Sequence, residues 1–94
     1  MKITNEDVAL YEVYLESEKD EPNMMDASAR IREKLKNKDI DFSELYSSLK
    51  SKGYITGTMI GGKNMNFGNL EGDVIDITAK GEKRIEDIMN IINR

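Results

Sequence analysis

Ser43, Ser47 and Ser51 recur every four residues in a stretch that the sequence pattern predicts to be one helix, residues 41–52. Residues four apart share one face of a helix, so the three hydroxyls are expected to line one exposed edge. Hydroxyl groups bond to phosphate oxygens and to base edges, and they are equally common as inert surface groups. The same stretch holds no arginine, asparagine or glutamine, the side chains that best recognise a base with two hydrogen bonds.

Positive charge gathers around the same helix. Residues 30–52 carry seven basic and four acidic side chains, and residues 1–26 carry two basic and eight acidic ones, so their net charges are +3 and −6. The basic residues of segment 30–52 are Arg30, Arg32, Lys34, Lys36, Lys38, Lys50 and Lys52. One interpretation is a phosphate-facing patch, and the other is the ordinary solvated exterior of two helices. The candidate DNA-binding residues are Lys34, Ser43, Ser47, Lys50, Ser51, Lys52 and, further along, Lys63.

The composition excludes several kinds of chemistry. The 94 residues contain no cysteine and no histidine, which removes thiolate and imidazole catalysis and the commonest transition-metal ligands. The acidic run Glu16, Glu18, Asp20 and Glu21 lacks the spacing of a calcium loop, so we interpret it as a solvated helix end. The glycines lack the spacing of a phosphate loop. We therefore expect no enzymatic activity, no cofactor and no metal site.

Three helices are expected in the first half of the chain. Thr4 and Asp7 fit a capping box at the start of the first helix, and Asn23 or Asp26 caps the second, after the single proline. Asp41 caps the third helix, and Gly53 ends it in a left-handed conformation. The expected core stripes are Val8, Tyr11 and Leu15 in the first helix, Met24, Ser28, Ile31 and Leu35 in the second, and Phe42, Leu45, Tyr46 and Leu49 in the third.

The pattern after Gly53 changes to one typical of β-strands. Residues 54–60 are rich in β-branched and aromatic types, residues 61–64 form a strong turn signal, and residues 65–70 are predicted to be the returning strand. Residues 74–77 are predicted to form a further short extended segment. A hydroxyl cap at Thr78 then opens a last helix, whose predicted apolar stripe is Ile85, Ile88, Met89 and Ile92.

The predicted order is helix, helix, helix, hairpin, helix. It indicates an α+β fold of the winged helix-turn-helix type in a single domain, residues 1–94, with the wing near residues 54–77. The phrase Leu-x-x-x-Gly-Tyr-Ile at 49–55, followed by Ile-Thr-x-x-Gly at 77–81, resembles the YjcQ-like family of small winged-helix proteins of Gram-positive bacteria and their prophages. The resemblance covers roughly residues 40–90. It implies a helix-turn-helix whose second helix is residues 41–52 and a wing tip near residues 61–64, and it implies little about activity.

Two functions are compatible with the sequence. The first is a small DNA-binding protein, a bacterial or prophage transcriptional regulator or accessory protein, that contacts double-stranded DNA through residues 41–52 and the wing. The second is a protein–protein interaction module without nucleic acid, which the net charge of −4 and the acidic first helix favour. A homodimer contact could involve Ile91 with Leu10 or Val13. No apolar run approaches the length of a membrane span, so we expect no membrane contact and a cytoplasmic location.

Overall fold

Local capping signals in the sequence set where the first two helices begin. The computed structural model describes residues 3–37, 39–57 and 75–92. Helix α1 (Asn5–Ser17) begins with the predicted capping box, in which the Thr4 hydroxyl accepts the Asp7 N–H and the Asp7 carboxylate accepts the Thr4 N–H. Helix α2 (Met24–Leu35) begins at Asn23, whose side chain accepts the Met25 N–H at 3.0 Å, so Asn23 rather than Asp26 is the cap.

Helix α3 (Phe42–Ser51) has a predicted cap at each end. The Asp41 side chain accepts the Glu44 N–H at 3.1 Å. At the other end Gly53 has a φ of 77°, and its N–H and that of Tyr54 donate back to the carbonyl groups of Lys50 and Leu49. This pair of bonds is a Schellman motif, which satisfies carbonyl groups that the helix leaves open.

The antiparallel strands β1 (Ile55–Gly57) and β2 (Ile75–Ile77) follow α3 and lead into helix α4 (Ala79–Ile92). Ile55 pairs with Ile77, and Gly57 with Ile75. The predicted partner of the first strand, residues 65–70, lies outside the described residues, as do Lys38, Lys63 and the predicted wing tip. The strand that pairs with β1 comes from the segment that we predicted to be separately extended.

The two sequence phrases around β1 and β2 interlock. The Thr78 hydroxyl donates to the Gly53 carbonyl at 2.6 Å and accepts the Gly81 N–H at 3.0 Å, and the Thr78 N–H donates to the Tyr54 carbonyl. A Cβ atom at Gly81 would lie 2.2 Å from that Tyr54 oxygen. Only glycine fits there, because any side chain at position 81 would collide with the backbone of Tyr54. The missing side chain therefore lets the first turn of α4 pack against the turn that follows α3.

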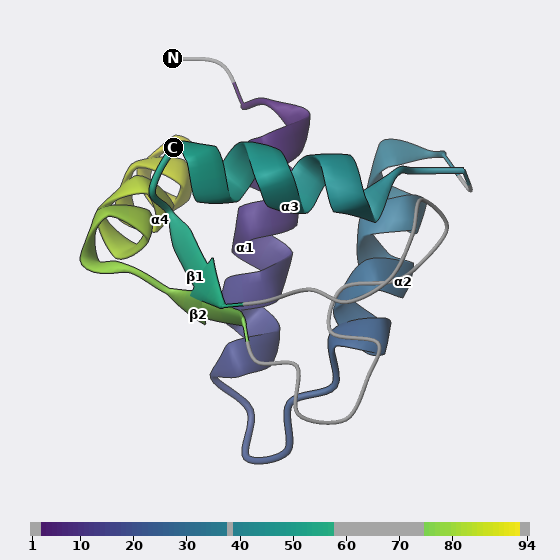
Figure 1. The fold of residues 1–94 in the computed structure, drawn as a ribbon, viewed down its shortest axis with the longest axis horizontal. Coiled ribbons are helices and arrows are strands. Elements are labelled where there is room, and N and C mark those ends of the chain that lie inside the picture. Colours follow the sequence, from purple (N-terminus) through teal and green to yellow (C-terminus); the bar gives the residue numbers. More distant parts are fainter. Residues whose placement is uncertain (1–2, 38, 58–74, 93–94) are drawn as a thin grey trace.

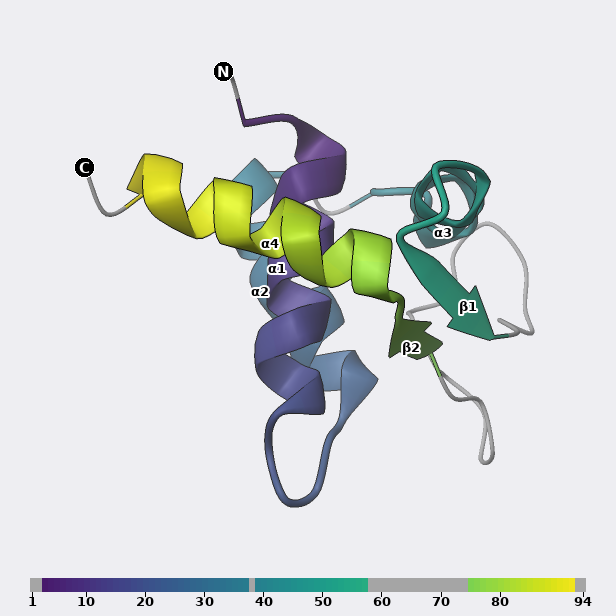
Figure 2. The same cartoon turned by 90° about the vertical axis from the view of Figure 1, so that its left-hand side faces the viewer.

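The described residues thus form an α+β fold of four helices and one antiparallel strand pair between α3 and α4, the predicted element order. Figure 1 shows α3 lying across α1, with α2 along one side of α1 and the strands on the other. Figure 2 shows α4 crossing α1. The core comprises Ala9, Leu10, Val13, Ile31, Ile40, Phe42, Leu49, Ile55, Ile75, Ile85 and Ile88.

The predicted stripe of the first helix was partly wrong. Ala9, Leu10 and Val13 are buried, whereas Leu15, which we expected in the core, is 38% exposed. The reason is that α1 packs against α2, α3 and α4 together, so that a single apolar stripe does not describe it. Leu10 and Val13 lie inside the core, so the predicted dimer contact of Ile91 with Leu10 or Val13 is wrong.

The stripe of the last helix is half confirmed. Ile85 and Ile88 are buried, whereas Met89 and Ile92 are 37% and 54% exposed. Among the described residues, no helix has both the length and the apolar character needed to cross a membrane.

Candidate functional site

The predicted serine edge of α3 exists in part. Ser47 and Ser51 are exposed, and Ser43 is half-buried. Lys50 is exposed, but its ammonium group lies 3.2 Å from the Gly57 carbonyl oxygen. Lys50 therefore joins α3 to the end of β1, which leaves its charge only partly available to a ligand.

A hydroxyl from the same helix contacts the same carbonyl. Tyr46 donates its phenolic hydrogen to Gly57, and the Lys50 ammonium lies 3.3 Å from the Tyr46 oxygen. Lys52, the next candidate cation, is exposed and lies close enough to Glu6 to lower the pKa of that carboxyl. The positive charge at the end of α3 is thus partly balanced within the domain.

Two basic residues of the predicted patch are held by carboxylates of α1. Arg30 bonds to Glu12 at 2.7 Å and to Glu16 at 2.9 Å, and Lys34 bonds to Glu12 at 2.8 Å. Both carboxylate side chains are only 1% exposed, while those of Arg30 and Lys34 are 32% and 51% exposed. Arg30 and Lys34 therefore serve the α1–α2 contact, and Lys34 retains an exposed half.

The burial of Glu16 corrects the prediction of a wholly solvated acidic helix end. Burial alone would raise its pKa, but the Asn23 N–H, Arg30 and Lys19 outweigh this and lower the pKa of Glu16 to about 2. Burial likewise opposes ionisation of Glu12, and Lys34 and Arg30 overcome it, so that its pKa lies below the ordinary value. Both groups stay charged at neutral pH as parts of the fold.

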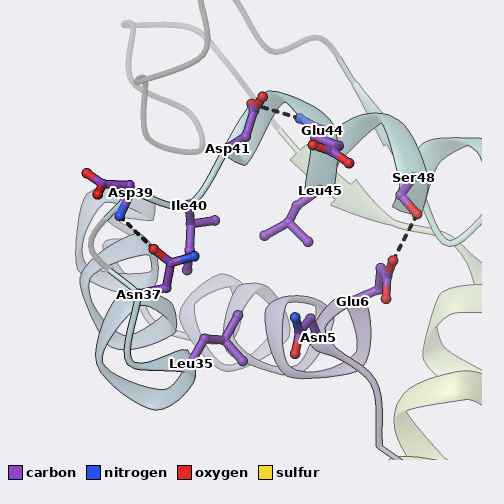
Figure 3. A pocket seen from close by; sticks show the side chains of 10 residues that line it. All are labelled: Asn5, Glu6, Leu35, Asn37, Asp39, Ile40, Asp41, Glu44, Leu45 and Ser48. Carbon is purple, nitrogen blue, oxygen red and sulfur yellow. Dashed lines mark hydrogen bonds between the residues drawn. The ribbon is translucent and has the colours of Figure 1, made fainter.

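A groove that no sequence pattern indicated lies on the flank of α3 opposite Lys50. The groove has a volume of about 520 Å³ and lies between the start of α1, the connection from α2 to α3, and α3 itself. Its lining residues are Asn5, Glu6, Leu35, Asn37, Asp39, Ile40, Asp41, Glu44, Leu45 and Ser48. Figure 3 shows the apolar side chains around the middle of this space and the carboxylates of Asp39, Asp41 and Glu44 at its margin.

The groove combines an apolar centre with negative charge. Leu35, Ile40 and Leu45 supply the apolar surface, and the lining also includes four carboxylates and no lysine or arginine among the described residues. Such a surface disfavours anions and suits a ligand that is both cationic and partly apolar. The described residues hold no group of three or more acidic side chains placed to bind a metal ion.

Two of the groove carboxylates are held in place by the fold. Asp41 is bonded to the start of α3, and Glu6 accepts the Ser48 hydroxyl at 3.4 Å. The pKa of Glu6 is lowered, first by its own backbone N–H. Burial opposes this effect, and Lys52 and the Thr4 and Ser48 hydroxyls add to it. Glu6 therefore carries its negative charge at neutral pH.

The groove has only a weak signal in the sequence, a short cluster of acidic residues. Asp39, Asp41 and Glu44 stand within six residues at the start of α3, and in the sequence they count as a cap and as net charge. Nothing local indicates that α1 brings Glu6 to the same place.

Comparison with models of protein families, with curated proteins and with solved structures finds no match. The resemblance to the YjcQ-like family therefore stays a prediction.

Proposed function

We propose that this chain is a winged-helix module that binds another protein through α3 and the groove beside it. The observation that carries the proposal is the distribution of charge around α3. The groove at its start is acidic with an apolar centre, whereas Arg30 and Lys34 of the neighbouring helix are bonded to buried carboxylates.

The negative charge stands where a DNA reader needs the opposite sign. Helix-turn-helix proteins commonly place the N-terminal residues of the recognition helix in the major groove. Here that end carries Asp41 and Glu44, with Asp39 and Glu6 beside them. These carboxylates repel phosphates, and a protein partner with complementary charge is attracted by the same field.

The size of the groove suits one or two side chains of a protein partner. A volume of about 520 Å³ is typical of a pocket that takes a compact group. Protein interfaces commonly derive much of their binding energy from a few anchors seated in such pockets.

A pair of measurements tests the proposal. A photo-crosslinking amino acid at Asp39, at the margin of the groove, is expected to trap one defined protein in cells of the native host. The same group at Glu86, an exposed position of α4, is expected to trap none. The adduct should disappear when Glu44→Lys is added. Tight binding of a random DNA duplex at low salt, with no adduct from position 39, would overturn the proposal.

A second candidate function rests on the outer face of α3. Exposed Ser47 and Ser51, followed by Lys50 and Lys52, could contact the phosphates of double-stranded DNA, as in a bacterial or prophage regulator. In that case Lys50→Ala/Lys52→Ala would weaken binding to all duplexes alike and reduce its salt dependence, as measured by fluorescence anisotropy. Absence of any duplex binding at low salt would exclude this function.

A further inference from the structure

We infer that the occupant of the groove is a cationic segment of the partner, in which a lysine or arginine is accompanied by an aliphatic residue. This inference rests on the proposed protein-binding function and adds the chemistry of the partner. It is drawn from the contrast between two kinds of lining, the apolar centre at Leu35, Ile40 and Leu45 and the carboxylates around it.

Lysine and arginine match both kinds of lining at once. Their side chains have an aliphatic stem that packs on apolar surface and a charged end that reaches a polar rim. In the groove the stem would pack on Leu45 and Leu35, and the charged end would meet Glu44, Asp41 or Glu6. A purely apolar segment would bring no cation to the carboxylates, and an acidic segment would be repelled by them.

Each buried carboxylate among the described residues is matched by a cation of the domain itself. Glu12 and Glu16 are matched by Arg30 and Lys34, and Asp7 is matched by Arg84 at 2.6 Å. The described lining of the groove contains no such cation. A partner that brings one completes in the groove the kind of contact that α1 already makes with α2 and α4.

Part of the rim is already positioned for this contact. The Glu44 N–H holds Asp41, and the Ser48 hydroxyl holds Glu6. Side chains that are fixed before binding lose less conformational entropy when the partner arrives.

The test uses the full chain labelled with ¹⁵N and three blocked peptides of equal length. The first alternates leucine and lysine, the second replaces each lysine by glutamate, and the third replaces each leucine by glycine. We expect the leucine–lysine peptide to shift the amide signals of Leu45 and Ser48, and to bind at least about tenfold more tightly than either of the others. Equal binding of the lysine–glycine peptide would overturn the role of the apolar centre, and tighter binding of the glutamate peptide would overturn the role of charge.

Matched variants separate the groove from general attraction by an acidic protein. Asp39→Lys/Glu44→Lys changes the groove, and Glu18→Lys/Glu86→Lys makes the same change of net charge at exposed positions outside its lining. The first pair should weaken binding of the leucine–lysine peptide by about tenfold or more, and the second by less than about threefold. Equal losses in the two variants would overturn the inference.

A charge-removing variant and the crosslinking result distinguish failure of the inferred partner chemistry from failure of the proposed function. Asp39→Asn/Glu44→Gln removes the same two charges with little change of shape. It should also weaken binding of the leucine–lysine peptide, so the role of charge can still be tested if the lysine pair perturbs folding. If no peptide binds but crosslinking from Asp39 still traps one protein, the inference about the partner's chemistry fails and the proposed function stands. If crosslinking also fails and duplex DNA binds, the proposed function fails.

Discussion

Helix α1 places carboxylates in two different surroundings. In its second half, Glu12 and Glu16 are 1% exposed and are bonded to Arg30, Lys34 and Lys19. At its start, half-buried Glu6 lines an open groove, where it accepts the Ser48 hydroxyl and has no ion pair, although the exposed Lys52 is close enough to lower its pKa. Glutamate therefore forms buried ion pairs at the α1–α2 contact and lines a solvent-accessible groove at the start of α1.

The difference follows from the cost of removing a charge from water. A buried carboxylate without a partner costs several kcal/mol, so the chain must provide cations at the α1–α2 contact. The groove carboxylates are exposed or half-buried, so their contact with solvent is largely kept and folding does not demand a buried ion pair for them. Charges that folding does not require are the ones most available to a partner, so stability measurements should distinguish the two regions.

Acid should produce the largest effect, and it should act through the α1–α2 contact. The folded-state pKa of Glu16 lies at about 2, below its ordinary value of 4.5, so its stabilising effect is complete above pH 4.5 and is lost as the pH falls toward 2. Glu16 alone accounts for a loss of about 3 kcal/mol in the free energy of unfolding across that range. Glu12 and Asp7, whose pKa values are also lowered, add to the loss. Urea unfolding at several pH values measures it.

Glu16→Gln provides the control for the acid effect. The variant should be less stable than the wild-type protein at neutral pH and should lose less stability on acidification, because the group that takes up the proton is gone. Identical pH slopes for the two proteins would show that Glu16 is not the titrating group.

Removing the central cation should have the next largest effect. Arg30→Met leaves Glu12 and Glu16 buried with Lys34 and Lys19 as their remaining charged partners. We expect a loss of about 3 kcal/mol in the free energy of unfolding, at the lower end for a broken buried ion pair because Arg30 is 32% exposed. The midpoint of urea unfolding is the readout. Lys83→Met, at an exposed position of α4, should change stability by less than about 0.5 kcal/mol, and a similar loss in both variants would contradict the assignment.

The structural features that could be predicted from sequence are those whose hydrogen-bonding residues lie close together in the chain. The caps at Thr4, Asn23 and Asp41 and the left-handed Gly53 all depend on bonds between residues at most five apart, and each is present. The interlock of Thr78 with Gly53 shows that local phrases can also be coupled at a distance. The phrases at residues 49–55 and 77–81 could each be recognised in the sequence, but the contact between them could not.

The features that escaped prediction depend on which elements meet. Glu16 resembles any acidic residue at a helix end until α2 brings Arg30 against it, 14 residues further along the chain. The groove is likewise assembled from three separate segments, and its carboxylates in sequence indicate only a cap and net charge. Side-chain type and periodicity carry no record of such tertiary neighbours, so both the buried ion pairs and the groove required the structure.

Asp41 should give an intermediate effect, because it belongs to the groove and also caps α3. Asp41→Ala removes the acceptor for the Glu44 N–H and should lower the free energy of unfolding by about 1 kcal/mol, as is typical for loss of an N-cap. Asp41→Ser, which retains an oxygen acceptor, should recover most of this stability without the charge. Thermal unfolding of the two variants makes the comparison. If the alanine and serine variants are equally destabilised, the charge of Asp41 rather than its cap stabilises α3.

Glu44 should give the smallest effect and the clearest contrast with Glu16. Its side chain is exposed at the margin of the groove, in the first turn of α3, where a negative charge interacts favourably with the helix dipole by a few tenths of a kcal/mol. Glu44→Gln forfeits that small interaction and relieves repulsion from Asp41 and Asp39, so the net change in the free energy of unfolding should stay below about 0.5 kcal/mol. Urea unfolding of Glu44→Gln beside Glu16→Gln makes the same chemical change in both regions. A loss at Glu44 as large as that at Glu16 would mean that the fold requires the groove charge, and the distinction between the two regions would then fail.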